Sequence, residues 1–99
     1  NETLKLYNVF NFPNPFSNKT KFTFELSAAA EVNIYVYTLG GKKIKQFKNR
    51  NLSNGFQSIE WNGRNEFGKT LANGVYIYKI IAKNNDHEIS HIGKCAIFK

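Results

Sequence analysis

The residue types that support catalysis are sparse in this chain, and their spacing is unfavourable. Cys95 is the single cysteine, so the chain can form neither an internal disulfide bond nor a cysteine-based zinc site. A catalytic cysteine also needs a nearby base in an electropositive setting. His91 lies four residues before Cys95, which in an extended strand corresponds to about 13 Å. We therefore predict a buried Cys95 that acts as a small apolar residue.

The remaining histidine and the amide side chains give no stronger signal for a metal centre. His87 lies four residues before His91, a strand spacing that suits two zinc ligands poorly. Asn62, Asn65 and Glu66 offer oxygen atoms to a calcium ion, but the loop has few carboxylates for such a site. We expect these side chains to form hydrogen bonds within the turn, and we predict no metal and no cofactor.

Glu60 and Glu66 are two carboxylates that flank the turn at residues 61–65. A glycosidase needs two carboxyl groups that face each other across a cleft. Glu60 alternates with Trp61, so we expect it on the surface. The sequence therefore predicts a protein that is not an enzyme.

The charge balance is basic, with 14 Lys plus Arg against 7 Asp plus Glu and a formal net charge of +7. Such a charge favours acidic partners. Near Tyr35, Tyr37 and Phe47 lies one basic run, which consists of Lys42, Lys43, Lys45, Lys48 and Arg50. Lysines beside aromatic residues suit single-stranded nucleic acid, but no RNA-recognition signature is present. We interpret the run as a solvated hairpin that protects an edge strand, with an anionic surface contact as the second interpretation.

Hydrophobic residues recur with period two, which is typical of half-buried strands. In residues 21–26, for example, Phe22, Phe24 and Leu26 share one face. The segment 75–81 is apolar on both faces, as expected of an inner strand. About seven strands are expected, at residues 4–12, 21–26, 31–37, 43–47, 56–61, 75–81 and 89–98.

Turn residues separate these strands, among them three Asn-Gly pairs and the Gly40-Gly41 hairpin. Strands at this spacing favour a single antiparallel β-sandwich. We expect residues 1–11 to be a linker or first strand and residues 12–99 to be the folded domain. No apolar run approaches the roughly 18 residues that span a bilayer, and we interpret the chain as part of a longer protein whose export signal lies upstream.

Five stretches resemble, in chain order, the motifs of a known module. Residues 12–16, FPNPF, followed by Thr20 and Phe22, resemble the "YPNPF…T.I.F" opening of the bacterial C-terminal sorting domains of the type IX secretion system. The related immunoglobulin-like domain of flagellar hook-capping proteins shares this opening. Residues 36–44 resemble the "IYDxxGRxV" hairpin of the family, with Thr38 in place of the usual aspartate.

The other three stretches lie in the second half of the chain. Residues 61–68 resemble "WDGRDxxG", residues 71–78 resemble "LASGVYxY", and residues 93–99 resemble the lysine-bounded terminal strand of a sorting domain. The resemblance extends from about Val9 to Lys99. It implies an immunoglobulin-like, antiparallel β-sandwich.

The resemblance also implies a non-enzymatic signal domain for protein export. Its parent protein would enter the periplasm, pass the outer membrane through the type IX translocon, and reach the cell surface or the medium. The implied partners are the translocon with its shuttle protein, a sortase, and an anionic lipopolysaccharide to which the sortase attaches the cargo. Nucleic acid is not an expected partner.

Two groups of residues follow from the resemblance. The family-motif residues have mainly structural roles: Pro13, Asn14, Pro15, Phe16, Phe22, Tyr37, Gly41, Trp61, Gly63, Gly68, Gly74 and Tyr76. The partner-recognition residues form the terminal strand: Lys94, Cys95, Ala96, Ile97, Phe98 and Lys99. We expect this strand to be an open edge that a partner extends by strand addition.

Two other classes of function remain open. One is a structural immunoglobulin-like module of a larger surface enzyme or adhesin, including the retained C-terminal domain of the sortase, a version that the Thr38 departure keeps open. The other is a carbohydrate-binding module, in which Tyr35, Tyr37 and Tyr78 would form a flat aromatic platform.

Overall fold

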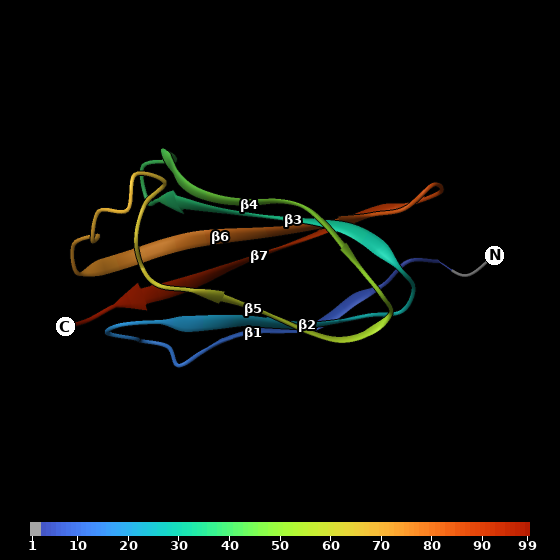
Figure 1. Cartoon of the computed structure of the whole chain (residues 1–99), viewed down its shortest axis with the longest axis horizontal. Helices are drawn as coiled ribbons and strands as arrows, with labels where there is room; N and C mark the ends of the chain where they lie inside the picture. The colour runs from blue at the N-terminus through green and yellow to red at the C-terminus, as the bar shows by residue number, and fades with distance from the viewer. Residues whose placement is uncertain (1–2) are drawn as a thin grey trace.

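Residues 3–99, which the computed structural model describes, form two antiparallel β-sheets packed face to face (Figure 1). One sheet has three strands in the order β1-β2-β5: β1 (Leu6–Phe12), β2 (Thr20–Leu26) and β5 (Gly55–Trp61). The other has four strands in the order β4-β3-β6-β7: β3 (Ala30–Thr38), β4 (Lys43–Leu52), β6 (Gly74–Lys83) and β7 (Glu88–Ile97). The predicted all-β, immunoglobulin-like sandwich is confirmed.

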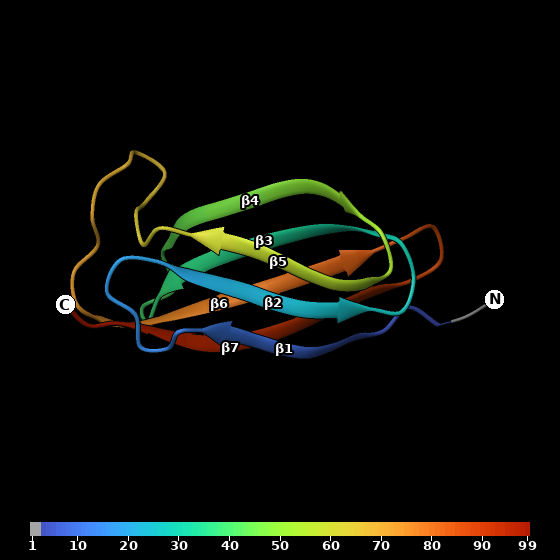
Figure 2. The same cartoon turned by 60° about the horizontal axis from the view of Figure 1, so that its bottom comes forward.

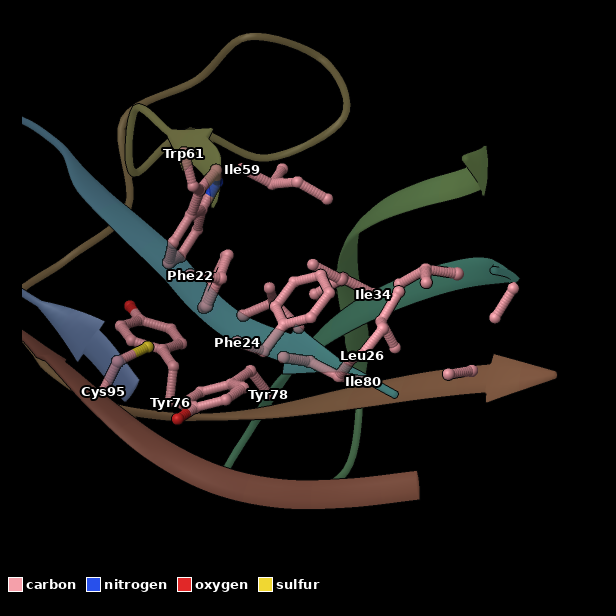
Figure 3. Packing of buried hydrophobic residues seen from close by; sticks show 14 of the residues in the cluster. Phe22, Phe24, Leu26, Ile34, Ile59, Trp61, Tyr76, Tyr78, Ile80 and Cys95 are labelled. Atoms are coloured by element: carbon pink, nitrogen blue, oxygen red, sulfur yellow. The ribbon is translucent and has the colours of Figure 1, made fainter. Parts of the chain in front are cut away.

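The period-two pattern of the sequence sets which face of each strand is buried. In β2, Phe22, Phe24 and Leu26 point into the sandwich, and each is at most 1% exposed. The inward residues of β3 and β6 oppose them across the gap, as Figure 3 shows for Ile34 and Ile80. Full burial of an aromatic or aliphatic side chain stabilises the fold by about 1.5–3 kcal/mol, so these facing rows hold the two sheets together.

An aromatic cluster closes the end of the core near the chain's C-terminus (Figure 3). The Phe22 ring stacks on Trp61 with centroids 6.1 Å apart and lies 5.0 Å from the Tyr78 ring. Phe16 meets the Trp61 ring edge-on at 5.5 Å. The Trp61 indole N–H donates to the Arg64 carbonyl oxygen at 3.0 Å, so its polar atom is paired.

The main departures from the predicted strands occur at two sheet edges. β4 continues to Leu52, beyond the predicted end at Phe47. The pattern did not predict this continuation, because bulges interrupt the alternation of β4; Asn49 in this stretch has φ 61°. β1 begins at Leu6 and is interrupted where Asn8 has φ 51°. A bulge adds one residue and breaks the period-two pattern, so neither feature is visible in the hydrophobic alternation.

The two ends of the described chain, residues 3–99, lie at opposite ends of the long axis, which extends 45 Å (Figure 1). Figure 2 shows β1 and β7, edge strands of different sheets, one over the other along one side of the sandwich. β6 lies between β3 and β7, so the predicted inner strand is confirmed. Over residues 3–99 there is no helix long and apolar enough to cross a membrane.

Candidate recognition site at the C-terminal end of the sandwich

Cys95 lies on the inner face of β7 and is 1% exposed, which confirms the predicted apolar role. Burial raises the pKa of its thiol to about 12, so the reactive thiolate is scarce at neutral pH. His91, on the same strand, is exposed to solvent. Within residues 3–99, no three His, Cys, Asp or Glu side chains come together as a metal site.

The loop after β5 uses its polar side chains to hold itself together, as expected. Asn62 Oδ1 accepts a hydrogen bond from the Arg64 N–H at 3.1 Å. Asn65 Oδ1 accepts from the N–H groups of Phe67 and Lys69 at 2.9 and 3.0 Å. Two of the three candidate calcium ligands therefore already satisfy backbone donors of the turn.

Glu66 has a role that the sequence did not reveal. Its N–H donates to the Ile44 carbonyl oxygen at 3.1 Å, and its carboxylate accepts from the Gln46 N–H at 3.3 Å. The carboxylate also pairs with Lys45 Nζ at 3.5 Å. Glu66 thus closes the outer edge of β4, where an edge strand would otherwise expose unpaired backbone groups.

The FPNPF segment closes the C-terminal part of the opposite edge of the same sheet, formed by β7. The Phe16 N–H donates to the Ala96 carbonyl oxygen and the Phe98 N–H donates to the Phe16 carbonyl oxygen, both at 2.9 Å. Asn14 adds two bonds from its side chain: Oδ1 accepts from the Ala96 N–H at 3.0 Å, and Nδ2 donates to the Lys94 carbonyl oxygen at 3.2 Å. We call Asn14 and Phe16, with these four bonds, the edge seal.

The edge seal corrects the expectation that the terminal strand is open to strand addition. β7 is an edge strand of its sheet, as predicted. However, the seal already pairs outward-facing backbone groups of Lys94, Ala96 and Phe98. A strand added there would have to displace Asn14 and Phe16, so a partner reaches this end of β7 through side chains.

The six predicted recognition residues divide by strand alternation. Cys95 and Ile97 face the core and are 1% and 2% exposed, so they cannot contact a partner of the folded domain. Ala96 is half-buried, whereas Lys94, Phe98 and Lys99 are exposed, and the Phe98 side chain is 70% exposed. The exposed terminal surface therefore consists of Lys94, Phe98 and Lys99.

Three of the family-motif residues, Phe16, Gly63 and Tyr76, make close contacts within the fold. Phe16 is 2% exposed and lies against Gly63, where an added Cβ would approach the Phe16 ring to 3.1 Å. Gly63 also has φ 73°, so both space and backbone conformation favour glycine there. The Tyr76 hydroxyl donates to the Ala72 carbonyl oxygen at 2.7 Å, which fixes the approach to β6.

The other motif residues lie on the surface or in turns. Tyr37 is half-buried on the outer face of β3, and the remaining members are exposed: Pro13, Asn14, Pro15, Gly41, Gly68 and Gly74. The burial of Phe16 and Trp61 agrees with the structural role expected for them.

The basic run does not form one patch, because the β4 bulges distribute it over both faces. Lys43 Nζ lies 5.2 Å from the Tyr35 ring centroid on the outer face. Lys45 and Arg50 instead lie over the Phe47 ring, at 5.2 and 5.9 Å. Lys42 and Lys48 are exposed. β4 is an edge strand, as the interpretation of a protected edge requires.

The three-tyrosine platform predicted for a carbohydrate module is wrong. Tyr35 and Tyr37 are neighbours on the outer face of β3, with ring centroids 6.5 Å apart. Tyr78 faces the core and is 3% exposed, because β6 directs its even-numbered residues inward. Two half-buried tyrosines remain on that face.

Comparison with known proteins places this geometry in a family. The sequence model of the FlgD Ig-like domain matches residues 11–86. The protein named basal-body rod modification protein FlgD from Buchnera aphidicola is 38% identical over 72 residues, which cover 72% of this chain and 32% of that protein. The chain thus spans about a third of the length of that relative.

Solved structures share the fold. Dimeric latent PorU from Porphyromonas gingivalis superposes with TM-score 0.80 and 16% identity over 98% of this chain and 10% of that one. PorZ, described as an essential surface component of the type IX secretion system of the same organism, gives TM-score 0.62 and 18% identity over 93% and 12%. FlgD from Xanthomonas campestris gives TM-score 0.62 and 19% identity over 95% and 64%.

Proposed function

The chain belongs to the FlgD Ig-like domain family, and we propose that it is a non-catalytic export domain. In this proposal it directs a parent protein from the periplasm through the type IX secretion system, and the cargo reaches the outer membrane, the cell surface or the medium. The exposed terminal surface formed by Lys94, Phe98 and Lys99 is the recognition element.

The edge seal is the observation that carries this proposal. It joins the first family motif to the last: Asn14 and Phe16 bind Lys94, Ala96 and Phe98 through four hydrogen bonds. A secretion machine that recognises a folded domain needs a surface of fixed shape, since ordering a loose segment on binding costs affinity. The seal supplies this, because it holds the end of the chain while Phe98 stays exposed.

The structural comparisons are compatible with the proposed role in type IX export. The superposition on PorU covers nearly the whole chain and has a higher TM-score than that on FlgD, 0.80 against 0.62. PorZ, the second type IX protein, shares the fold as well. These similarities support the shared fold alone. The proposal of type IX export rests in addition on the order of the sequence motifs.

Charge supports an acidic partner. The formal net charge is +7, and the exposed terminal surface combines Phe98 with two lysines, Lys94 and Lys99. This combination suits a partner surface that has both an apolar pocket and acidic residues, and opposite charges accelerate the encounter. Within this proposal, the translocon with its shuttle protein and the sortase are the partners, and anionic lipopolysaccharide is the acceptor of the cargo.

A reporter fusion tests the proposal. A signal peptide, a fluorescent protein and this domain are joined and expressed in a type IX-competent host and in its translocon mutant. We expect reporter at the surface or in the medium of the competent strain alone. Reporter that stays in the periplasm of both strains would contradict an independent export signal.

A structural module is the second candidate, and the 38% identity to a FlgD protein favours it. The FlgD structure from Xanthomonas campestris is described in terms of hook capping for flagellar assembly. In this case the domain would stiffen a larger assembly and carry no export information. Periplasmic retention of the fusion together with a flagellar gene context would favour this candidate.

A further inference from the structure

The outer edge of β7 is open along its first half. Its register with β6 is continuous from the pair Lys83–Glu88 to the pair Gly74–Ile97, so alternate residues direct their backbone groups outward. The bonds of the edge seal show that the even-numbered residues of β7 direct their backbone N–H and C=O groups away from β6. It follows that the backbone groups of Glu88, Ser90 and Ile92 also point away from β6, and within residues 3–99 no hydrogen bond reaches them.

The other edges offer less to a pairing strand. β1 is interrupted by the bulge around Asn8, and β4 carries bulges as well as the Glu66 contacts. β5 has seven residues against the ten of β7. An unbulged edge is the kind that pairs with another chain.

The open half of β7 is complementary to itself, and we propose that it pairs with β7 of a second copy of this chain. In an antiparallel pair centred on His91, Ser90 of each copy opposes Ile92 of the other. Both are outward-facing residues, so they exchange N–H···O=C bonds in two symmetric sets. This interface goes beyond the export function and does not depend on it.

The charges on β7 and the length of its open half favour the register centred on His91. Centring on His91 sets Glu88 of one copy opposite Lys94 of the other, so the symmetric interface contains two pairs of opposite charge. The two Ile92 side chains, each 63% exposed, become diagonal neighbours on the outer face. The partner's strand begins at Glu88, opposite Lys94, which is where the edge seal begins; the hairpin before Glu88 turns away toward β6.

A cysteine at the two-fold axis tests the pairing. His91 opposes its own copy at a non-hydrogen-bonded position, where Cα atoms are about 4.5 Å apart, within the range of a disulfide bond. We expect His91→Cys to form a disulfide-linked dimer under mild oxidation. Lys83→Cys, also exposed but on β6, is the matched control and should stay monomeric. Absence of cross-linking at position 91, or equal cross-linking at both positions, overturns the proposal.

Charge reversal tests the register by sedimentation equilibrium at several protein concentrations. Each single variant, Glu88→Lys or Lys94→Glu, makes two like-charge pairs, and we expect the dimer dissociation constant to rise about tenfold. The double variant restores opposite charges and should recover the original constant. Wild-type protein that is monomeric at every concentration, or single variants that dimerise unchanged, would overturn it. Association is measured on purified protein, so failure here is separable from failure of the export assay.

Discussion

Asn14 completes the outer edge of β7 with its side chain alone. Its Oδ1 accepts from the Ala96 N–H at 3.0 Å while its Nδ2 donates to the Lys94 carbonyl oxygen at 3.2 Å. A carboxamide carries a donor and an acceptor side by side, as a peptide group does, so one side chain replaces a piece of neighbouring strand. The terminal strand is thereby held by a segment that precedes six of the seven strands.

Removal of this side chain should loosen the terminal strand. Asn14→Ala loses both bonds, and we expect the free energy of unfolding to fall by about 1–2 kcal/mol, given roughly 1 kcal/mol for each net hydrogen bond. Urea unfolding measures this. Asn18→Ala, at an exposed position in the same connection, is the control and should be neutral. Equal stability of Asn14→Ala and wild type would show that the edge seal contributes nothing.

Gly93 gives space to the Tyr78 ring on the adjacent strand. A Cβ at position 93 would lie 2.5 Å from Tyr78 Cζ and Oη. The ring is buried beside Phe22, so it cannot move away freely. We expect Gly93→Ala to destabilise the domain by about 1–3 kcal/mol, as overpacking does.

A double-mutant cycle with Tyr78→Leu identifies the cause. The smaller side chain leaves room for the new Cβ, so the cost of Gly93→Ala should shrink in that background. Strictly additive costs would mean that the penalty comes from the backbone at position 93 and not from contact with the tyrosine.

Cys95 makes stability depend on alkaline pH. Burial raises the pKa of its thiol from 9.0 to about 12, so between these values the unfolded chain has lost the proton that the folded chain retains. The contribution of this thiol to the free energy of unfolding is therefore constant below about pH 9, and it falls as the pH rises toward 12. Burial also raises the pKa of Tyr78, which acts in the same direction.

Urea unfolding at several alkaline pH values checks the Cys95 contribution. Cys95→Ala removes one titrating group, so the decline above pH 9 should become shallower even though the variant is less stable overall. A decline of unchanged slope would assign the effect to other groups. In the native protein, thiol reagents should modify Cys95 at neutral pH only as fast as the domain opens.

The hydrophobic alternation of the sequence predicts the strands and most of the core residues. It does not predict the bulges and contacts at the sheet edges. Alternation places Phe22 and Phe24 inward without any knowledge of the partner sheet. It cannot place Tyr78, because β6 is apolar on both faces and either face satisfies the pattern. The bulge of β1 and one of the two bulges of β4 coincide with single residues of positive φ, Asn8 and Asn49, which leave the composition of the strand unchanged.

The hydrophobic alternation also could not predict the edge seal, although the sequence contains one signal for it. Asn14 stands between two prolines, which have no backbone N–H to donate, so the hydrogen-bond donors of residues 13–15 are limited to the backbone N–H and the carboxamide of Asn14. The partner of those bonds, some 80 residues away, cannot be read from local spacing. The same holds for Glu66, whose carboxylate reaches β4 across the loop.

In the proposed function, the export machinery recognises the exposed terminal surface on the sealed strand. Deletion of residues 95–99 would be a poor test, because it removes the buried Cys95 and Ile97 and would unfold the domain. Phe98→Ala removes a 70% exposed ring at the C-terminal end of the sandwich, and Phe56→Ala removes a 67% exposed ring at the opposite end.

The most direct measurement is the surface and medium fluorescence of the reporter fusion in the type IX-competent host, compared among wild type, Phe98→Ala and Phe56→Ala. The folded state of each domain is verified by its unfolding transition. We expect export to fall several-fold for Phe98→Ala and to stay at the wild-type level for Phe56→Ala. Equal export of all three fusions, or a larger loss for Phe56→Ala, would contradict recognition through the terminal surface.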